Sequence, residues 1–366
     1  MHGGDIYRQQ VTYDFSVNIN PLGLPAAVQQ VLDNSRGLAM QYPDLQCQKL
    51  RMQLADRLGI RPEQILCGNG ASELILAVCQ MLRPQKALLS APCFSGYETA
   101  LQAVGTEVIH VPLSEAEGFA FTEEYGRKLE TRIREEKPEL LFLTTPNNPT
   151  GKLTEPDHIR KVLAVCGETG TYLVLDECFM ELTGQAAQYS MLREIDNYEN
   201  LLILRAFTKT FAMPGIRLGY LVGQQTILSR IQQQLPEWNV STLAQAAGVA
   251  ALADMQYLEK ACGLIESERN RMSRELRKLG CMVYPSDANY IMFYVNQSSK
   301  QENMGLREGD AGADLKEKLS RKQILIRDCS DYPGLTDGYY RVAVKLPKEN
   351  QVLLEAIAEI LKQAGE

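Results

Sequence analysis

Short apolar runs alternate with amphipathic helical patterns through the middle of this 366-residue chain. The runs have the length of buried strands and occupy residues 87–90, 140–144, 172–175 and 201–204. Helical patterns lie between some of them, at residues 95–104 and 155–167. Strands that alternate with helices need crossover connections, which produce a mostly parallel sheet covered by helices. The sequence therefore predicts an α/β fold.

Polar or aromatic residues follow these predicted strands at the points where the strands end. They are Phe94, Asn148, Asp176 and Lys209. Because parallel strands present their carboxyl ends at one edge of the sheet, and ligands bind beyond that edge, we expect these side chains to share one site.

Lys209 lies in a polar turn between two apolar runs, at residues 201–204 and 218–222. An ammonium group near buried strands is costly, and a lysine that loses proton affinity becomes a nucleophile that forms Schiff bases. The alternative is a solvated loop lysine. Arg217 follows eight residues later and suits a phosphate bidentately. An aldehyde and a phosphate on one ligand suggest pyridoxal phosphate.

Two further features agree with that ligand, and each has a simpler alternative. A glycine-rich turn at residues 68–70 opens a helical pattern, so its backbone N–H groups can bind an anion, although such turns cap many helices. Asp176 ends an apolar run and needs a cation there, which a pyridinium N–H would supply. An aspartate after a strand can also simply cap a helix.

The last third of the chain predicts a smaller α+β domain. A long helical segment from about residue 244 to 279 leads to predicted strands at residues 283–295, 323–326 and 339–344. Arg327 and Arg341 lie at these strands, where each alone would be interpreted as a solvated arginine. We assign residues 1–40 to an arm that is part of the small domain, 41–250 to the large domain and 251–366 to the small domain. The polar segment 296–312 is expected to be a loop.

Composition limits the classes of partner and the cellular compartment that we expect for this chain. A net charge of −7 argues against nucleic acid as the main partner, and no apolar run has membrane-spanning length. Nine cysteines without C-x-x-C spacing indicate reduced thiols in a cytoplasmic protein. Three histidines far apart in sequence predict no metal site.

Several motifs, in this order along the chain, resemble fold-type I pyridoxal-phosphate enzymes, the aspartate aminotransferase superfamily. They are Pro-Asn-Asn-Pro-Thr-Gly at 146–151, Asp-Glu at 176–177, Thr-Lys at 208–209 and Arg-Leu-Gly-Tyr at 217–220. The resemblance spans residues 1–366. Two branches of the superfamily compete, the histidinol-phosphate aminotransferases and the threonine-phosphate decarboxylases of cobalamin biosynthesis. The stretches at residues 2–4, 14–23, 326–335 and 339–343 look like the decarboxylases.

The resemblance implies a role in cofactor binding for each matching residue. Lys209 would bond the cofactor aldehyde, Asp176 would face the pyridine nitrogen and Asn148 would face the ring 3-oxygen. Phe94 would stack on the ring. The cofactor phosphate would be surrounded by Gly70, Ala71, Ser72, Thr208 and Arg217. Tyr42 would reach the phosphate of the neighbouring subunit's cofactor, which implies a homodimer.

The resemblance also implies the substrate contacts. Arg341 would hold a substrate carboxylate, and the residues near a substrate phosphate would be His2, Asn20 and Arg327. Three departures matter: Phe179 replaces a tyrosine that bonds the cofactor 3-oxygen in many aminotransferases, Ala206 replaces a hydroxyl residue that helps hold the cofactor phosphate, and the 296–312 loop is longer than in the family.

The cofactor residues alone leave the reaction open. If the bond from Cα to the carboxylate stands perpendicular to the cofactor ring, CO2 leaves and Lys209 returns a proton to Cα. If the C–H bond stands there, the same residues perform transamination. The resemblance favours decarboxylation of L-threonine O-3-phosphate; the alternatives are a histidinol-phosphate-type aminotransferase, a decarboxylase of another phosphorylated amino acid such as phosphoserine, and a non-catalytic pyridoxal-phosphate sensor.

Overall fold

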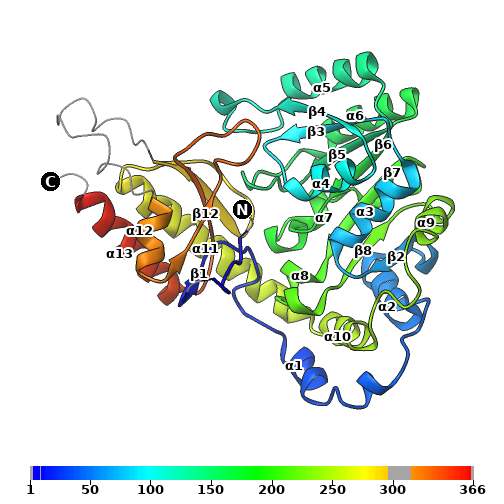
Figure 1. Cartoon of the computed structure of the whole chain (residues 1–366), viewed down its shortest axis with the longest axis horizontal. Coiled ribbons are helices and arrows are strands. Elements are labelled where there is room, and N and C mark those ends of the chain that lie inside the picture. The colour runs from blue at the N-terminus through cyan, green and yellow to red at the C-terminus, as the bar shows by residue number, and fades with distance from the viewer. Residues whose placement is uncertain (1–2, 9, 296–314, 364–366) are drawn as a thin grey trace.

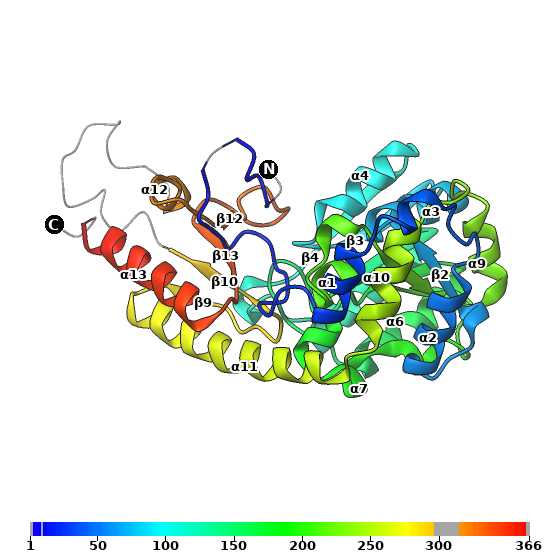
Figure 2. The same cartoon turned by 90° about the horizontal axis from the view of Figure 1, so that it is seen from below.

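The computed structural model describes residues 3–8, 10–295 and 315–363, which form a large and a small part (Figure 1). The predicted 296–312 loop and His2 lie outside the described residues. A seven-stranded sheet forms the centre of the large part, and a four-stranded sheet forms the centre of the small part. The helix α11 (Met255–Lys278) runs along both parts, as Figure 2 shows.

The large sheet has the order β2-β8-β7-β6-β5-β3-β4. Its strands are β2 (Ile65–Gly68), β3 (Lys86–Ala91), β4 (Glu107–Pro112), β5 (Leu140–Thr144), β6 (Tyr172–Asp176), β7 (Leu201–Ala206) and β8 (Gly219–Val222). The pairs between β7, β6, β5, β3 and β4 are parallel, whereas β8 is antiparallel to both of its neighbours. The predicted mostly parallel sheet is confirmed. The chain returns from β7 to β8 through residues 207–218 without crossing the sheet, so β8 pairs with β7 in the antiparallel direction.

Helices cover both faces of this sheet, which explains why its strands read as continuous apolar runs. Along β7, Leu201 and Ile203 face one core, while Leu202 and Leu204 face the other, as the two-residue period of a strand requires. The first core is completed by α2 (Gln48–Leu58), α5 (Glu123–Glu136), α6 (Pro156–Thr169) and α10 (Thr242–Leu252). The second is completed by α3 (Ala71–Leu82), α4 (Ser95–Ala103) and α9 (Gln225–Gln232).

The small part contains an antiparallel sheet of order β12-β13-β10-β9. Its strands are β9 (Met282–Val283), β10 (Tyr290–Tyr294), β12 (Arg327–Asp328) and β13 (Tyr339–Ala343), and it packs with α11, α12 (Leu315–Arg321) and α13 (Pro347–Gln363). The N-terminal arm joins this part, because β1 (Tyr13–Asp14) pairs with β11 (Ile324–Leu325) and Phe15 is buried in the same core. The arm then crosses to α1 (Ala26–Asp33), which packs against α10.

Two predicted elements differ from the structure. The single helix expected over 244–279 is two helices, because the chain turns at Asp254, whose carboxylate accepts the Tyr257 N–H and begins α11. The strand expected over 283–295 is interrupted between β9 and β10, where Asp287 binds Lys152 and the backbone N–H of Leu153 in the large part.

The short helices α7 (Ala186–Tyr189) and α8 (Phe207–Thr210) complete the described elements of regular α-helix. The helix α11 contributes Ala261 and Ile265 to the core of the large part and Met272 and Leu276 to that of the small part. The domain boundary near residue 250 therefore stays a prediction, since one helix serves both cores. No helix in the described ranges is long and apolar enough to cross a membrane.

Candidate active site

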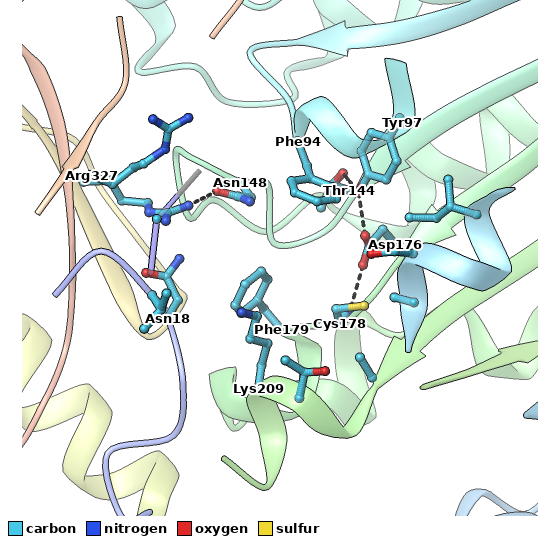
Figure 3. Close-up of a pocket in the computed structure, with 18 of the residues that line it drawn as sticks. Asn18, Phe94, Tyr97, Thr144, Asn148, Asp176, Cys178, Phe179, Lys209 and Arg327 are labelled. Atoms are coloured by element: carbon cyan, nitrogen blue, oxygen red, sulfur yellow. Dashed lines mark hydrogen bonds between the residues drawn. The ribbon is translucent and has the colours of Figure 1, made fainter. Parts of the chain in front are cut away.

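A cavity of about 240 Å³ lies between the two parts, at the carboxyl ends of β5, β6 and β7 (Figure 3). Most of the predicted site residues line it: Ala71, Ser72, Phe94, Asn148, Asp176, Thr208, Lys209, Arg217, Arg327 and Arg341. Asp176 is the last residue of β6, Asn148 lies just beyond β5, and Lys209 lies in α8 directly after β7. Neighbouring parallel strands therefore place these three side chains around one space.

Lys209 projects into this cavity. Its ammonium has no hydrogen bond and no ion pair within the part of the chain that the structure describes, and it lies 6.0 Å from the centre of the Phe179 ring. Burial, assisted by the nearby cations Arg341 and Arg217, lowers the pKa of Lys209 to about 8. A substantial fraction of this amine is therefore neutral near physiological pH and can act as a nucleophile.

Asp176 is a buried carboxylate, only 7% exposed. Tyr97 donates to its Oδ2 at 2.5 Å, and the backbone N–H of Cys178 donates to its Oδ1 at 2.8 Å. Burial raises the pKa of Asp176, while the hydrogen bonds from Cys178 and Tyr97 act in the opposite direction. Among the described residues no cationic side chain pairs with Asp176, so a cationic N–H of a ligand would be its natural partner.

Arg217 and the start of α3 form an anion cradle at one end of the cavity. A Cβ atom at Gly70 would lie 2.5 Å from Arg217 Nη2, so only glycine lets the guanidinium lie against this turn. Gly70 has φ of 83°, which also favours glycine. The N-terminus of the twelve-residue helix α3 and the side chains of Ser72 and Thr208 line the same end.

These features fit pyridoxal phosphate. The amine of Lys209, which has no hydrogen bond or ion pair among the described residues, suits its aldehyde. The buried carboxylate suits its pyridine nitrogen, and the cradle suits its phosphate. Ala206 also lines the cavity and offers no hydroxyl, so the donors to a cofactor phosphate would have to come from the α3 turn, Thr208 and Arg217.

Arg341 lies at the opposite side of the cavity and is only 5% exposed. It donates to Asn148 Oδ1, and its Nη2 donates to the Ser16 carbonyl at 2.8 Å. In the amide orientation that satisfies the local network, Asn18 Oδ1 accepts from Arg341 Nε at 3.2 Å. All of these acceptors are neutral, and no carboxylate pairs with Arg341 in the described ranges.

Arg327 is the direct cross-strand neighbour of Arg341, on β12 opposite β13. Directly opposite residues of an antiparallel pair point to the same face, so the fold places two cations side by side at the cavity, and like charges in that position repel. Unlike Arg341, Arg327 has an anionic partner: its Nη2 donates to both carboxylate oxygens of Asp331, at 2.7 and 3.0 Å.

Three predicted residues lie outside the cavity lining. Asn20 is buried beside it, where its Nδ2 donates to the Thr210 carbonyl and its Oδ1 accepts from the Leu22 N–H. The structure therefore places Asn20 outside the cavity lining, where Asn18 lies instead, and a position of Asn20 near a substrate phosphate stays a prediction. Gly70 lies behind Arg217, and Tyr42 is 82% exposed on the surface.

The sequence interpretation also missed residues that the structure places at the site. Tyr97 follows Phe94 by three residues, a spacing that turns both toward the same side at the start of α4. Asn18 precedes Asn20 by two residues in the same Asn-rich segment. Tyr332 lies with its ring 4.9 Å from the Arg327 guanidinium. The spacing of Tyr97 and the position of Asn18 were signals in the sequence, and Tyr332 belongs to the stretch 326–335 that resembles the decarboxylases, although no role was assigned to it.

The family model for aminotransferase class I and II matches residues 11–357. The chain belongs to this family. It is 33% identical to a threonine-phosphate decarboxylase of Salmonella typhimurium, over 98% of this chain and 96% of that protein. It is 32% identical to a histidinol-phosphate aminotransferase of Nitratidesulfovibrio vulgaris, over 95% of this chain and 88% of that protein.

Comparison with a solved structure assigns the chain to the same fold as an aminotransferase. The histidinol-phosphate aminotransferase from Clostridium acetobutylicum superimposes with a TM-score of 0.85 at 30% identity, covering 96% of this chain and 99% of that chain. The predicted fold class, a fold-type I enzyme of the aminotransferase superfamily, is confirmed.

Proposed function

We propose that this chain is a pyridoxal-phosphate enzyme that decarboxylates L-threonine O-3-phosphate to (R)-1-amino-2-propanol O-2-phosphate and CO2, a step of cobalamin biosynthesis. The observation that carries the proposal is the pair of opposed arginines, Arg327 and Arg341, at the same cavity as Lys209. Two adjacent cationic anchors suit a substrate with two anionic groups. The similarity to the Salmonella typhimurium threonine-phosphate decarboxylase supports this substrate.

The position of each cofactor-binding residue in the cavity determines which part of the cofactor it would contact. Lys209 would hold the cofactor through its aldehyde, Asp176 would face the pyridine nitrogen and Phe94 would lie against the ring. The cofactor phosphate would be received by Arg217, Thr208, Ser72 and Ala71. Because Asn148 uses its Oδ1 to accept from Arg341, its Nδ2 is left to donate to the ring 3-oxygen. When bound, the cofactor supplies a sink for the electron pair released as a bond to Cα breaks.

The substrate residues decide which bond breaks. Arg341 binds the carboxylate and Arg327 binds the phosphate, so rotation about the bond between the substrate nitrogen and Cα is fixed at two points. With the substrate held in this orientation, the bond from Cα to the carboxylate would be the one that breaks. CO2 would leave, and the bound cofactor would supply the acceptor for the electron pair that remains on the Cα side. Lys209, whose pKa is lowered to about 8, then delivers a proton to Cα as a general acid.

A histidinol-phosphate aminotransferase is the second candidate. It is supported by the 32% identity to the Nitratidesulfovibrio vulgaris protein and by the close superposition on the Clostridium acetobutylicum structure. The same residues would then break the C–H bond, with Lys209 as the base that takes the proton. Phosphoserine is an alternative substrate for the decarboxylation, because it presents the same two anionic groups, a carboxylate and a phosphate.

We further infer a homodimer and a cytoplasmic location. Tyr42 and Trp238 form an exposed aromatic pair with ring centres 5.0 Å apart, a surface that a second copy would cover while Tyr42 reaches its cofactor phosphate. All nine cysteines are free thiols, which suits a reducing compartment.

A substrate panel tests the function. The cofactor-loaded protein is incubated with L-threonine O-3-phosphate, O-phosphoserine, L-threonine, or histidinol phosphate plus 2-oxoglutarate, and both CO2 and 2-oxoacid consumption are followed. We expect the highest kcat/KM for CO2 release from threonine phosphate. Faster glutamate formation from histidinol phosphate, without CO2, would contradict the proposal and establish the aminotransferase.

A further inference from the structure

The cation assigned to the substrate phosphate already holds an anion of its own chain. Arg327 donates to both carboxylate oxygens of Asp331, and its Nη1 donates to the Asp328 carbonyl at 2.7 Å. Its guanidinium lies 4.9 Å from the Tyr332 ring centre. A carboxylate whose two oxygens both accept from the same guanidinium nitrogen occupies the position that a phosphate oxygen would take.

The two partners of this ion pair differ in their exposure to water. The Arg327 side chain is only 8% exposed and is fixed by its strand, by Tyr332 and by the Asp328 carbonyl. The Asp331 side chain is 42% exposed and follows β12 in a turn, so water can solvate its carboxylate when another anion binds Arg327. Asp331 is therefore the partner that a bound anion can displace from Arg327.

We propose that Asp331 is a specificity-determining residue that occupies Arg327 until the phosphate of the substrate displaces it. A phosphate carries about twice the charge of a carboxylate and three acceptor oxygens, so it can replace Asp331 when the amino and carboxylate groups of the same molecule are also bound. Free inorganic phosphate lacks those extra anchors and competes poorly. The site therefore binds small anions weakly. While Asp331 occupies Arg327, its negative charge compensates the repulsion between Arg327 and Arg341.

This inference rests on the assignment of Arg327 to the phosphate in the proposed function, but it has its own readout. An internal competitor lowers the apparent affinity of every ligand that must displace it. The apparent dissociation constant equals the intrinsic one divided by the fraction of molecules in which the site is free. A partly exposed ion pair with two hydrogen bonds lies in the upper part of the range for such pairs, which corresponds to about a three- to fivefold factor. Ligands that do not use Arg327 are unaffected.

The test compares Asp331→Asn with the unaltered cofactor-loaded enzyme. We expect the dissociation constant of inorganic phosphate and the KM of the phosphorylated substrate to fall about three- to fivefold, with kcat unchanged. The KM of unphosphorylated threonine should stay the same. A gain of affinity is informative because damage to the fold would produce a loss instead.

Asp337→Asn is the matched control, because Asp337 is an exposed aspartate of the same turn region, and it removes the same charge without touching Arg327. It should leave phosphate affinity within twofold of the unaltered enzyme. Asp331→Ala provides a second variant, and thermal unfolding shows that each variant is folded. Unchanged or weaker phosphate binding in both Asp331 variants would overturn the inference. Because inorganic phosphate binding is measured directly, the result does not depend on whether the enzyme releases CO2 or transfers an amino group.

Discussion

Replacement of Arg341 by alanine should separate the carboxylate contact from the phosphate contact. Arg341 is buried, its acceptors in the described ranges are neutral, and it faces the cavity opposite Lys209. A charge-assisted contact to a substrate carboxylate contributes about 2–3 kcal/mol, so kcat/KM should fall roughly 30- to 150-fold. The variant also leaves Asn148 Oδ1 and the Ser16 carbonyl without their donor, which should cost about 1–3 kcal/mol of folding stability.

The assay uses three ligands that differ by one anionic group. L-Threonine O-3-phosphate carries both groups, L-threonine lacks the phosphate, and the product amine phosphate lacks the carboxylate. Arg341→Ala should weaken the first two and spare the product. The matched variant Arg327→Ala, at the cross-strand neighbour, should weaken the substrate and the product and spare threonine. Denaturant unfolding of both variants measures the structural cost separately.

One pattern would refute this reasoning. If Arg341→Ala weakened the product as strongly as the substrate, Arg341 would hold the cavity together or bind the phosphate, and the carboxylate would need another anchor. Equal losses for threonine and threonine phosphate in Arg327→Ala would likewise remove Arg327 from the phosphate site.

Three further predictions concern the protein without substrate. Because the pKa of Lys209 is lowered, the unfolded chain binds more protons than the folded chain between pH 8 and 10.5. The free energy of unfolding of the cofactor-free protein should therefore rise by roughly 3 kcal/mol from this group as the pH rises across that window. Lys209→Met should abolish this rise in urea titrations, and an unchanged pH dependence would contradict the prediction. Hydrogen bonds from Tyr284 and Tyr339 lower the pKa of Glu115, so their contribution to folding stability is present above the usual glutamate pKa and is lost as the pH falls below it. Glu115→Gln should therefore lower the melting temperature at pH 7, and the difference in melting temperature between this variant and the unaltered protein should become smaller in acid. Mixed dimers of Lys209→Ala and Tyr42→Phe chains should recover cofactor affinity at only some of their sites, whereas a fully active monomer at micromolar concentration would remove Tyr42 from the site.

The large sheet was predictable because its strands are buried on both faces. The runs at β5 and β6 carry their site residues at or just beyond their last positions, so Asn148 and Asp176 could be placed together without coordinates. The edge strand β4 was not predicted, because its residues are partly exposed and its pattern is less apolar. The antiparallel direction of β8 also has no sequence signature, since a strand reads the same in either direction.

The substrate side of the cavity was less predictable, because its contacts cross the chain. The strand predicted at 323–326 contains only the two residues of β11, which pairs with β1 outside the four-stranded sheet. The strand β12, which carries Arg327, also has two residues, too few for a periodic signal. Asn18 and Asn20 look equivalent in sequence, and only the bonds of Asn20 to residues 22 and 210 show that it turns away from the cavity. The pairing of Arg327 with Asp331 depends on the turn after β12, so their spacing alone would have suggested nothing.

The fate of the substrate Cα hydrogen tests the central claim most directly. The reaction is run in D2O with L-threonine O-3-phosphate, and the deuterium content at C1 of the product is measured by NMR. Loss of CO2 followed by proton delivery from Lys209 predicts one deuteron at C1, with the original Cα hydrogen retained and one CO2 released per product. Exchange of the Cα hydrogen with solvent, or an oxoacid in place of the amine, would show that the C–H bond breaks and would contradict the account.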